Sequence, residues 1–554
     1  MSTAISVLGG VGLFLLGMTA MTEGLKGLAG SALRTVLSKA AATPLRGSFW
    51  GALVTLLVQS SSATTMTTIG LVSAGLLTFA QGLGLVFGAN VGTTGTGWLV
   101  ALIGVRVSLT AAALPMIFVG ALIKLLASGR MSGAGAALAG FGLVLFGLTT
   151  LQQGMGGLAD RLHPADLPPV LAGPDVGWWR AMLGALALVV FGLVMTALMQ
   201  SSTAAVAVTM SAYFAGAVGL DQGCALIIGQ NIGTATSSAL AAIGASTTAK
   251  RLAIAYVLFK MIAAVIALVL FPIVTPLLVR ASKAIDGVTL LAAYHTAYNV
   301  VGVLVLMPVI ERFTRLVERI LPERGSPLTR CLDPSALATP VVAVEAVRRT
   351  IARVLAAVCD FVETALVAQS RGEPAPGKNA IAMHEAVDAS RQAQVFLSDV
   401  AGPPDTDDEQ QQLTSTLHAL DHASRLAETA VAMDFATVRG GPDDIRAGQL
   451  CADAMRIATA VANDVAVPPV TERSPTALPD VKALSTDQAL VELERCAREL
   501  EKLQLTHRSA TLGAVARGTL TADAALVRVD ALRSLQALAR HAWRAAAHLV
   551  GHDR

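Results

Sequence analysis

The sequence predicts an all-α polytopic membrane protein with two inverted repeats, each containing a re-entrant helical hairpin, followed by a cytoplasmic helical bundle. Three observations support this prediction. The acidic residues are concentrated in the C-terminal part of the chain. Two polar motifs occur twice, at the same spacing, inside apolar sequence. The C-terminal part has the periodicity of amphipathic helices.

Charge is distributed very unevenly along the chain. Of the 38 acidic residues, eight lie in residues 1–320 and 30 in residues 321–554, and none lies between Glu23 and Asp160. A soluble domain needs carboxylates on its surface, whereas apolar runs of about 20 residues are typical of membrane spans. We expect spans at 5–22, 80–104, 107–128, 133–153, 222–244, 252–279 and 288–310. The net charge of +3 indicates no nucleic-acid partner, and the five scattered cysteines indicate no disulfide framework.

The membrane part repeats itself. The run "QSSSAT" at 59–64 returns as "QSSTAA" at 200–205, and "GANVGTT" at 88–94 returns as "GQNIGTA" at 229–235, both 141 residues later. Upstream, "LLGMTAMTEGLKGLA" at 15–29 matches "LFGLTTLQQGMGGLA" at 145–159. These matches divide the chain into membrane repeat 1 (1–130), membrane repeat 2 (131–285), a last transmembrane helix with its cytoplasmic junction (286–320) and a helical domain (330–554).

Both hydroxyl-rich runs interrupt apolar segments. Segments 48–78 and 181–215 are each broken near the middle, and each is long enough for a hairpin that enters and leaves the membrane on the same side. Three full crossings and one hairpin per repeat place the second repeat upside down relative to the first. With this topology ten Lys and Arg residues lie in inside loops and five in outside loops. The N-terminus is then outside and the C-terminal domain cytoplasmic.

The two hairpin tips are the predicted binding site. Irregular backbone at membrane depth is tolerated where it is buried in protein or lines a wet cavity, so inverted tips are expected to meet near the midplane. Helix N-termini and hydroxyls suit an oxyanion such as phosphate, and neutral oxygens suit a hard cation such as sodium. The candidate anion ligands are Ser60, Ser61, Ser62, Ser201, Ser202 and Thr203. The candidate cation ligands are Gln59, Asn90, Thr93, Gln200, Asn231 and Thr234, and the four amides among them are alternatively braces of the hairpins.

The predicted site contains no fixed positive charge, because no Lys or Arg lies in either motif or between 47 and 105. An uncompensated charge at the membrane centre costs about 3 kcal/mol or more. A cation that enters together with the anion offsets this cost, which predicts obligatory coupling of the two. Lys260 lies inside the span 252–279, where it could attract anions, pair with a backbone carbonyl or reach the interface. For His295 a packed or hydrogen-bonded role is favoured over a proton relay.

The paired motifs "VQSSSATT" with "GANVGTT" and "MQSSTAA" with "GQNIGTA" resemble the type II sodium-dependent phosphate cotransporter family over residues 1 to about 320. The resemblance implies a bacterial inner-membrane symporter of inorganic phosphate and sodium with no organic cofactor. Electrogenic animal members carry an acidic residue shortly after the first GAN element, and segment 95–115 has none. This difference favours a lower sodium stoichiometry.

The sequence of the C-terminal part predicts an all-α bundle of about six helices. The periodic segments are 332–358, 380–400, 410–434, 443–466, 484–507 and 521–549. Segments 417–430 and 529–549 resemble PhoU-like domains, which implies a regulatory module that also forms a homodimer. PhoU relatives bind metal through acidic motifs. Here an ion-paired helix face is favoured over a metal site for Asp421, Glu428, Asp360 and Glu363, because Arg425 stands among them.

Two alternatives to a sodium:phosphate symporter stay open. One is a sodium-coupled carrier of another small oxyanion, and the other is a non-transporting membrane receptor that reports phosphate through the helical domain. An enzyme is not predicted, because the sequence has no Walker loop, no nucleotide-binding fingerprint and no nucleophile–base pair at a recognisable spacing.

Overall fold

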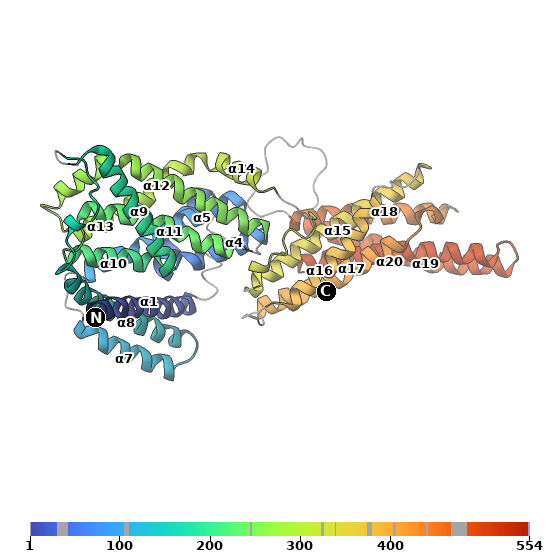
Figure 1. The fold of residues 1–554 in the computed structure, drawn as a ribbon. Coiled ribbons are helices and arrows are strands. Elements are labelled where there is room, and N and C mark those ends of the chain that lie inside the picture. Colours follow the sequence, from blue (N-terminus) through green and yellow to red (C-terminus); the bar gives the residue numbers. More distant parts are fainter. Residues whose placement is uncertain are drawn as a thin grey trace. The chain divides into compact units, whose positions relative to one another are not determined.

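The computed structural model describes residues 2–29, 42–104, 110–173, 176–243, 246–322, 326–337, 339–373, 379–400, 402, 406–438, 441–466 and 485–551. The named elements of these residues are all helices, which confirms the all-α class. The chain forms two compact units (Figure 1). The membrane unit comprises Met1–Ile69 and Thr78–Glu323, and the helical unit comprises Gly70–Leu77 and Arg324–Arg554.

The membrane unit is a set of apolar helices with short connections. They are α1 (Ser2–Ala29), α3 (Pro44–Val58), α4 (Ser61–Ser73, whose last residues belong to the helical unit), α5 (Phe79–Thr93), α6 (Gly95–Leu99), a π-helical turn (Val100–Gly104), α7 (Thr110–Leu126), α8 (Gly129–Ala159), α9 (Trp178–Met199), α10 (Ser202–Phe214), α11 (Leu220–Ala241), α12 (Thr247–Ala281), α13 (Gly287–Leu306) and α14 (Ile310–Ile320). Among the described residues, five helices are long and apolar enough to cross a membrane: Thr3–Ala29, Phe79–Leu102, Gly129–Ala159, Trp178–Met199 and Thr247–Ala281.

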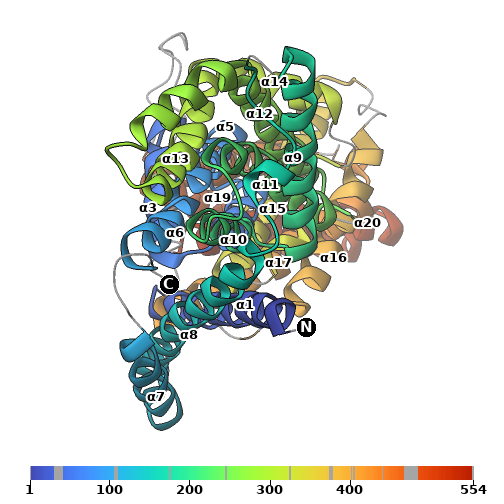
Figure 2. The same ribbon diagram turned by 60° about the vertical axis from the view of Figure 1, so that its left-hand side comes forward.

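The first helices of the two predicted repeats pack against each other in opposite directions. On α1, Gly10 lies against Leu151 of α8, and Gly24 lies against Ala137 of the same helix. The two helices therefore run antiparallel. Figure 2 shows α1 and α8 together, with α7 packed on α8. Because 15–29 and 145–159 are the matched segments, their antiparallel packing is the arrangement that an inverted repeat requires.

Each repeat also contains one very close pair of parallel helices. A methyl group at Gly88 of α5 would lie 1.8 Å from the carbonyl oxygen of Ser48 on α3. A methyl group at Gly229 of α11 would lie 1.8 Å from the carbonyl oxygen of Val189 on α9. Glycine permits this approach of two backbones, as small residues do between membrane helices. The two contacts are 141 residues apart, so the packing repeats with the sequence.

The chain reverses direction at the first hydroxyl-rich run. The hydroxyl of Thr55 on α3 donates to the hydroxyl oxygen of Thr64 on α4 at 2.9 Å. Residues nine apart in one straight helix would be about 13 Å apart along its axis, so α3 and α4 form a hairpin around Gln59. The second run separates α9 from α10 in the same way, but α9 has 22 residues and is long enough to span a membrane alone. The two repeats therefore differ in the length of this helix.

The helical unit contains six long helices in its described residues, the number that the periodicity predicted. They are α15 (Pro340–Ser370), α16 (Asn379–Ser398), α17 (Asp407–Ala432), α18 (Pro442–Ala466), α19 (Thr486–Ala516) and α20 (Ala522–Val550). The main packing partners are α15 with α18 and α17 with α20. Buried apolar side chains fill these seams, among them Cys359, Leu426 and Leu535.

We predict that Gly88→Ala destabilises the membrane unit. The added methyl group overlaps the Ser48 carbonyl oxygen, so α3 and α5 must separate, at a cost of about 1–3 kcal/mol. The measurement is the thermal melting temperature of the purified full chain in detergent. The matched control is Gly156→Ala on α8, where the new methyl group meets nothing within 4 Å. Equal melting temperatures for the two variants would contradict the close packing.

Candidate functional site

The two glutamines of the hydroxyl-rich runs have the same rare backbone conformation. Gln59 has φ 57° and Gln200 has φ 51°, and no other non-glycine residue in the described ranges has a positive φ. Each glutamine ends a helix, α3 or α9. The left-handed conformation costs a residue with a side chain roughly 1–2 kcal/mol, so both breaks are strained and must be held by their surroundings.

Hydrogen bonds brace both glutamines in the same pattern. The amide nitrogen of Gln59 donates to the Leu56 carbonyl, and that of Gln200 donates to the Ala197 carbonyl. The amide oxygen of Gln59 accepts from the Thr96 hydroxyl, and that of Gln200 accepts from the Ser237 hydroxyl, 37 residues later in each copy. Both glutamines, predicted as cation ligands or hairpin braces, brace the helix breaks in this structure.

The first serine of each run caps the helix that follows. The Ser60 oxygen accepts from the backbone N–H of Ala63 at 3.2 Å, and the Ser201 oxygen accepts from that of Ala204 at 3.2 Å. Such caps satisfy one of the free N–H groups at a helix start. Ser60 and Ser201, predicted as anion ligands, thus have a structural role at the starts of α4 and α10.

The next hydroxyls of each run are free. Within the described part of the chain, no hydrogen bond engages the hydroxyls of Ser61, Ser62, Ser202 or Thr203. All four stand in the first turn of a 13-residue helix, where backbone N–H groups lack helical acceptors. Free hydroxyls and N–H groups at a helix N-terminus are the donors that an oxyanion needs.

A second polar cluster joins the two Asn-containing motifs. Tyr256 of α12 donates its hydroxyl to Asn90 Oδ1 at 2.9 Å and lies 3.5 Å from the Thr234 hydroxyl. Asn90 comes from repeat 1 and Thr234 from repeat 2, so α12 links the motifs across the repeats. The remaining candidate, Thr93, donates to the carbonyl of Ala89 in its own helix.

Lys260 lies one turn after Tyr256 on α12 and reaches the second motif. Its Nζ is 3.3 Å from Asn231 Oδ1 and 3.5 Å from Asn299 Oδ1 of α13. The lysine is 2% exposed, so it does not extend to the interface. The expectation of a site without a fixed cation is therefore wrong for this cluster, because α12 supplies a lysine from outside the motifs.

Sequence reasoning missed Tyr256 and Asn299. The signal for Asn299 was its position in a predicted span one helical turn after His295, since polar side chains are rare there. The histidine is 2% exposed, and its Nδ1 has no hydrogen-bond partner among the described residues. No described hydrogen bond joins the free hydroxyls of Ser61 or Ser202 to the cluster around Lys260.

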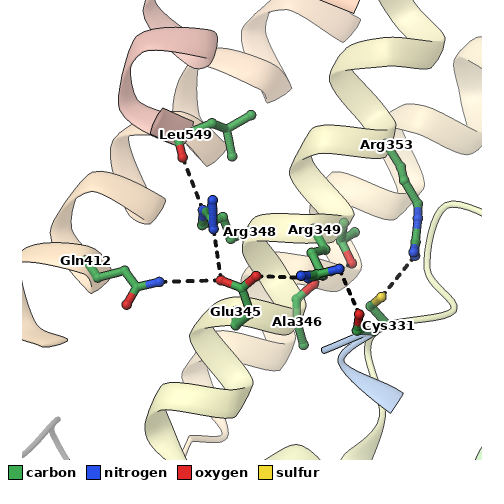
Figure 3. A network of polar contacts seen from close by, with 10 residues as sticks. Cys331, Glu345, Ala346, Arg348, Arg349, Arg353, Gln412 and Leu549 are labelled. Atoms are coloured by element: carbon green, nitrogen blue, oxygen red, sulfur yellow. Dashed lines mark hydrogen bonds and ion pairs between the residues drawn. The ribbon is translucent and has the colours of Figure 1, made fainter. Parts of the chain in front are cut away.

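The helical unit has its own polar network around Glu345 (Figure 3). The carboxylate accepts from Arg349 Nε at 2.8 Å and from Arg348 Nη1 at 3.0 Å. Arg349 is 3% exposed and also donates to the carbonyl oxygen of Gly75 at 2.8 Å. Gly75 lies in the turn between α4 and α5, and segment 70–77, which includes the last residues of α4 and this turn, belongs to this unit. Ser73 at the end of α4 donates to the buried carboxylate of Asp333.

Four histidines meet where α17 packs on α20. His422 Nδ1 is 3.1 Å from His541 Nδ1, and the His418 and His548 rings stack with centroids 5.0 Å apart. Burial, reinforced by nearby Arg540, lowers the pKa of His541 to about 4, and burial also lowers the pKa of His422. The sequence signal was the pair 418 and 422, which shares one face of a helix.

The acidic residues considered as metal remnants stand in ordinary surroundings. Asp421 pairs with Arg425 at 3.1 Å, which agrees with the predicted ion-paired face. Burial raises the pKa of Glu363. Within the described ranges, no group of three or more His, Cys, Asp or Glu side chains is arranged to hold a metal ion.

Duplicated helix breaks inside a repeated set of apolar helices are typical of secondary transporters. Residues 13–153 and 180–291 match the model of the Na+/Pi-cotransporter family. The membrane unit of this chain belongs to that family, as the paired motifs predicted. The family consists of transporters, not enzymes.

Three relatives show the range of similarity. YqeW of Bacillus subtilis, an uncharacterized protein, is 28% identical over 56% of this chain and 96% of its own length. YjbB of Escherichia coli, whose name provisionally assigns it to inorganic phosphate export, is 31% identical over 63% of each chain. The human sodium-dependent phosphate transport protein 2B is 47% identical over 62 residues, 9% of its length. The chain thus spans somewhat less than two thirds of YjbB, and no solved structure matches it.

We predict that acid destabilises the helical unit through His541. Its folded-state pKa of about 4 lies below the value of about 6.5 in an unfolded chain. The unfolded chain therefore binds the proton first, and stability present above about pH 6.5 is lost as the pH falls toward 4. His541→Gln should reduce the fall in melting temperature of the full chain between pH 7 and pH 5. His384→Gln, at an exposed position of α16, should leave this fall unchanged. Identical pH profiles for wild type and His541→Gln would refute this assignment.

Proposed function

We propose that the protein is a secondary active transporter that couples sodium movement to the movement of inorganic phosphate across the membrane. The observation that carries the proposal is the pair of helix starts with free hydroxyls, Ser61 and Ser62 on α4 and Ser202 and Thr203 on α10. Each start offers hydroxyl and backbone N–H donors to an oxyanion. The family match supports phosphate as that oxyanion.

The proposed sodium ligands are neutral oxygens of the Asn-containing motifs on α5 and α11. Asn90 and Asn231 each donate their amide nitrogen to a carbonyl of their own helix, at 2.9 and 3.0 Å. This orients the amide oxygens away from their helices, toward Tyr256 and Lys260. Thr93 and Thr234 supply hydroxyl oxygens close by. Gln59 and Gln200 are proposed to contribute by holding the breaks open.

The proposed topology follows the duplication. Residues 1–130 and 131–285 form inverted repeats, 286–320 hold the last transmembrane helix, and both broken segments are re-entrant hairpins. The antiparallel packing of α1 and α8 supports the inversion. The proposed location is the bacterial inner membrane, with the N-terminus outside and the C-terminal domain in the cytoplasm. The name of YjbB provisionally assigns that protein to inorganic phosphate export; in this proposal the direction of phosphate movement follows the prevailing sodium and phosphate gradients.

Residues 330–554 are proposed to be a PhoU-like regulatory domain that also forms a homodimer. The support is the membership of residues 70–77 in the helical unit. This segment consists of the last residues of α4 and the turn after it, and α4 begins at the proposed phosphate donors. Arg349 and Asp333 hold the turn through Gly75 and Ser73. A change in the helical unit can therefore be transmitted along one rigid helix.

The test is phosphate uptake into proteoliposomes that contain the full chain, with and without a sodium gradient. A sodium gradient should accelerate uptake of labelled phosphate. Ser61→Ala and Ser202→Ala each remove a free hydroxyl and should lower transport about tenfold or more, at unchanged melting temperature. Uptake that ignores sodium would exclude the symporter, and phosphate binding without uptake would indicate a receptor. Preferential sodium-driven uptake of another oxyanion, such as sulfate, would change the substrate.

Ser60→Ala is the matched control for Ser61→Ala. Ser60 caps α4, so its loss should lower stability by about 1 kcal/mol. Ser61→Ala should lower transport without this loss of stability. If both variants behave alike in uptake and in melting, the separation of capping from binding serines is wrong.

The regulatory proposal predicts that removing the hydrogen bonds that hold segment 70–77 weakens the inhibition of transport by internal phosphate. Arg349→Lys keeps a charge beside Glu345 but cannot also reach the Gly75 carbonyl, and Ser73→Ala removes the bond to Asp333. With high phosphate inside the vesicles, both variants should be inhibited less than wild type, by about fivefold or more in initial rate. Arg425→Ala, which breaks an exposed ion pair on α17, is the control. Wild-type inhibition in both variants would contradict coupling through this segment.

A further inference from the structure

Lys260 is a charged group that has no role in the proposed function as described above. It lies in the 35-residue helix α12, on the buried side that faces α11 and α13, and is 2% exposed. A buried ammonium inside apolar helices is costly unless it is compensated. Its retention at this place requires a partner.

The surroundings of Lys260 resemble the shell of a bound metal cation. Two amide oxygens, Asn231 Oδ1 and Asn299 Oδ1, lie 3.3 and 3.5 Å from Nζ. The ring centroids of Tyr256 and Phe259 lie 5.5 and 5.9 Å away, within the range of cation–π attraction. Asn299 also donates to Asn231 Oδ1 at 3.2 Å, which keeps the two amides together.

No protein anion balances this charge within the described ranges. No carboxylate there forms an ion pair with Lys260. The described acids of the membrane unit stand instead at helix ends and loops, as Asp221 and Asp286 do at the starts of α11 and α13. Neutral oxygens lower the cost of the ammonium but do not cancel its charge. The remaining source of negative charge is the anion that the site transports.

We propose that the Lys260 ammonium is a tethered cation that takes the place of one sodium ion at Asn231 and Asn299. This inference rests on the proposed function and narrows it. The tethered charge compensates part of the charge of the bound oxyanion, so fewer sodium ions accompany each phosphate. The lysine supplies a fixed positive charge near the phosphate and does not bind the phosphate directly.

The two repeats are then unequal in charge. On the repeat 1 side, Asn90 Oδ1 accepts from the neutral hydroxyl of Tyr256. On the repeat 2 side, Asn231 Oδ1 accepts from the amino group of Lys260. A mobile sodium ion is expected on the side of Asn90, where no fixed charge opposes it. This gives a physical origin for a low sodium stoichiometry.

Three variants of the full chain in proteoliposomes test the proposal. Lys260→Met fills the same space without a charge and should lower sodium-driven phosphate uptake about tenfold or more. Lys260→Ala leaves room for an ion, so uptake should recover at high sodium. Its sodium Hill coefficient should rise by about one, and one more positive charge should move per phosphate. Lys124→Met removes an exposed lysine of α7 and should match wild type.

A further substitution, at Asn299, covers the case in which Lys260→Met does not reach the membrane. Asn299→Asp places a carboxylate at the oxygen now 3.5 Å from the ammonium and neutralises the charge inside a folded protein. It should lower uptake as Lys260→Met does.

The outcomes separate the two proposals. Wild-type uptake and an unchanged sodium Hill coefficient in Lys260→Met, Lys260→Ala or Asn299→Asp would overturn the tethered cation and leave the symporter intact. A melting temperature shift alone, with unchanged coupling, would assign Lys260 to packing and also overturn it. A wild-type protein that shows no sodium-driven phosphate uptake would remove the proposed function, and this inference with it.

Discussion

The absence of water at membrane depth is the constraint on which the arrangement of this protein depends. A helix that breaks there leaves backbone donors and acceptors that lipid cannot satisfy. At Gln59 and Gln200 the protein satisfies them from within, because each glutamine amide binds the end of one helix and the next serine caps the following helix. The hydroxyls beyond the caps stay free. The same local chemistry that makes the breaks tolerable therefore leaves donors for an anion.

The absence of water also means that a charged side chain must be compensated by groups of the protein. In water an ammonium group needs no partner, but in α12 Lys260 depends on whatever oxygens the neighbouring helices present. Tyr256, one turn away, contacts residues of both repeats, so this segment of α12 is where the duplicated halves meet. The two repeats share the close glycine contacts at 88 and 229, while their charged groups differ. A symmetric scaffold thus holds an asymmetric site.

The helical unit uses charge differently. Glu345 is surrounded by donors from Arg348, Arg349 and Gln412, so its buried carboxylate is satisfied inside the unit. One arginine of this network also holds the backbone of residue 75, from the turn that follows α4. A short piece of the membrane sequence is thereby part of the soluble fold. In the proposed regulation, this continuity of chain and hydrogen bonds connects the C-terminal part to α4.

The sequence by itself determined the elements and the duplication, because these depend on local composition and spacing. The polar break at residue 59, repeated at 200, and the six helices of the C-terminal part appear near their predicted positions, although α15 covers Pro340–Ser370 where 332–358 was predicted. Of the seven predicted spans, 107–128, 222–244 and 288–310 are not among the described helices that are long and apolar enough to cross a membrane. Tertiary structure decided which polar groups meet. Lys260 contacts residues 231 and 299, Arg349 contacts residue 75, and His422 contacts residue 541. Spacing along a chain does not specify how each helix is rotated about its axis or which distant helix it faces, and packing alone fixes both.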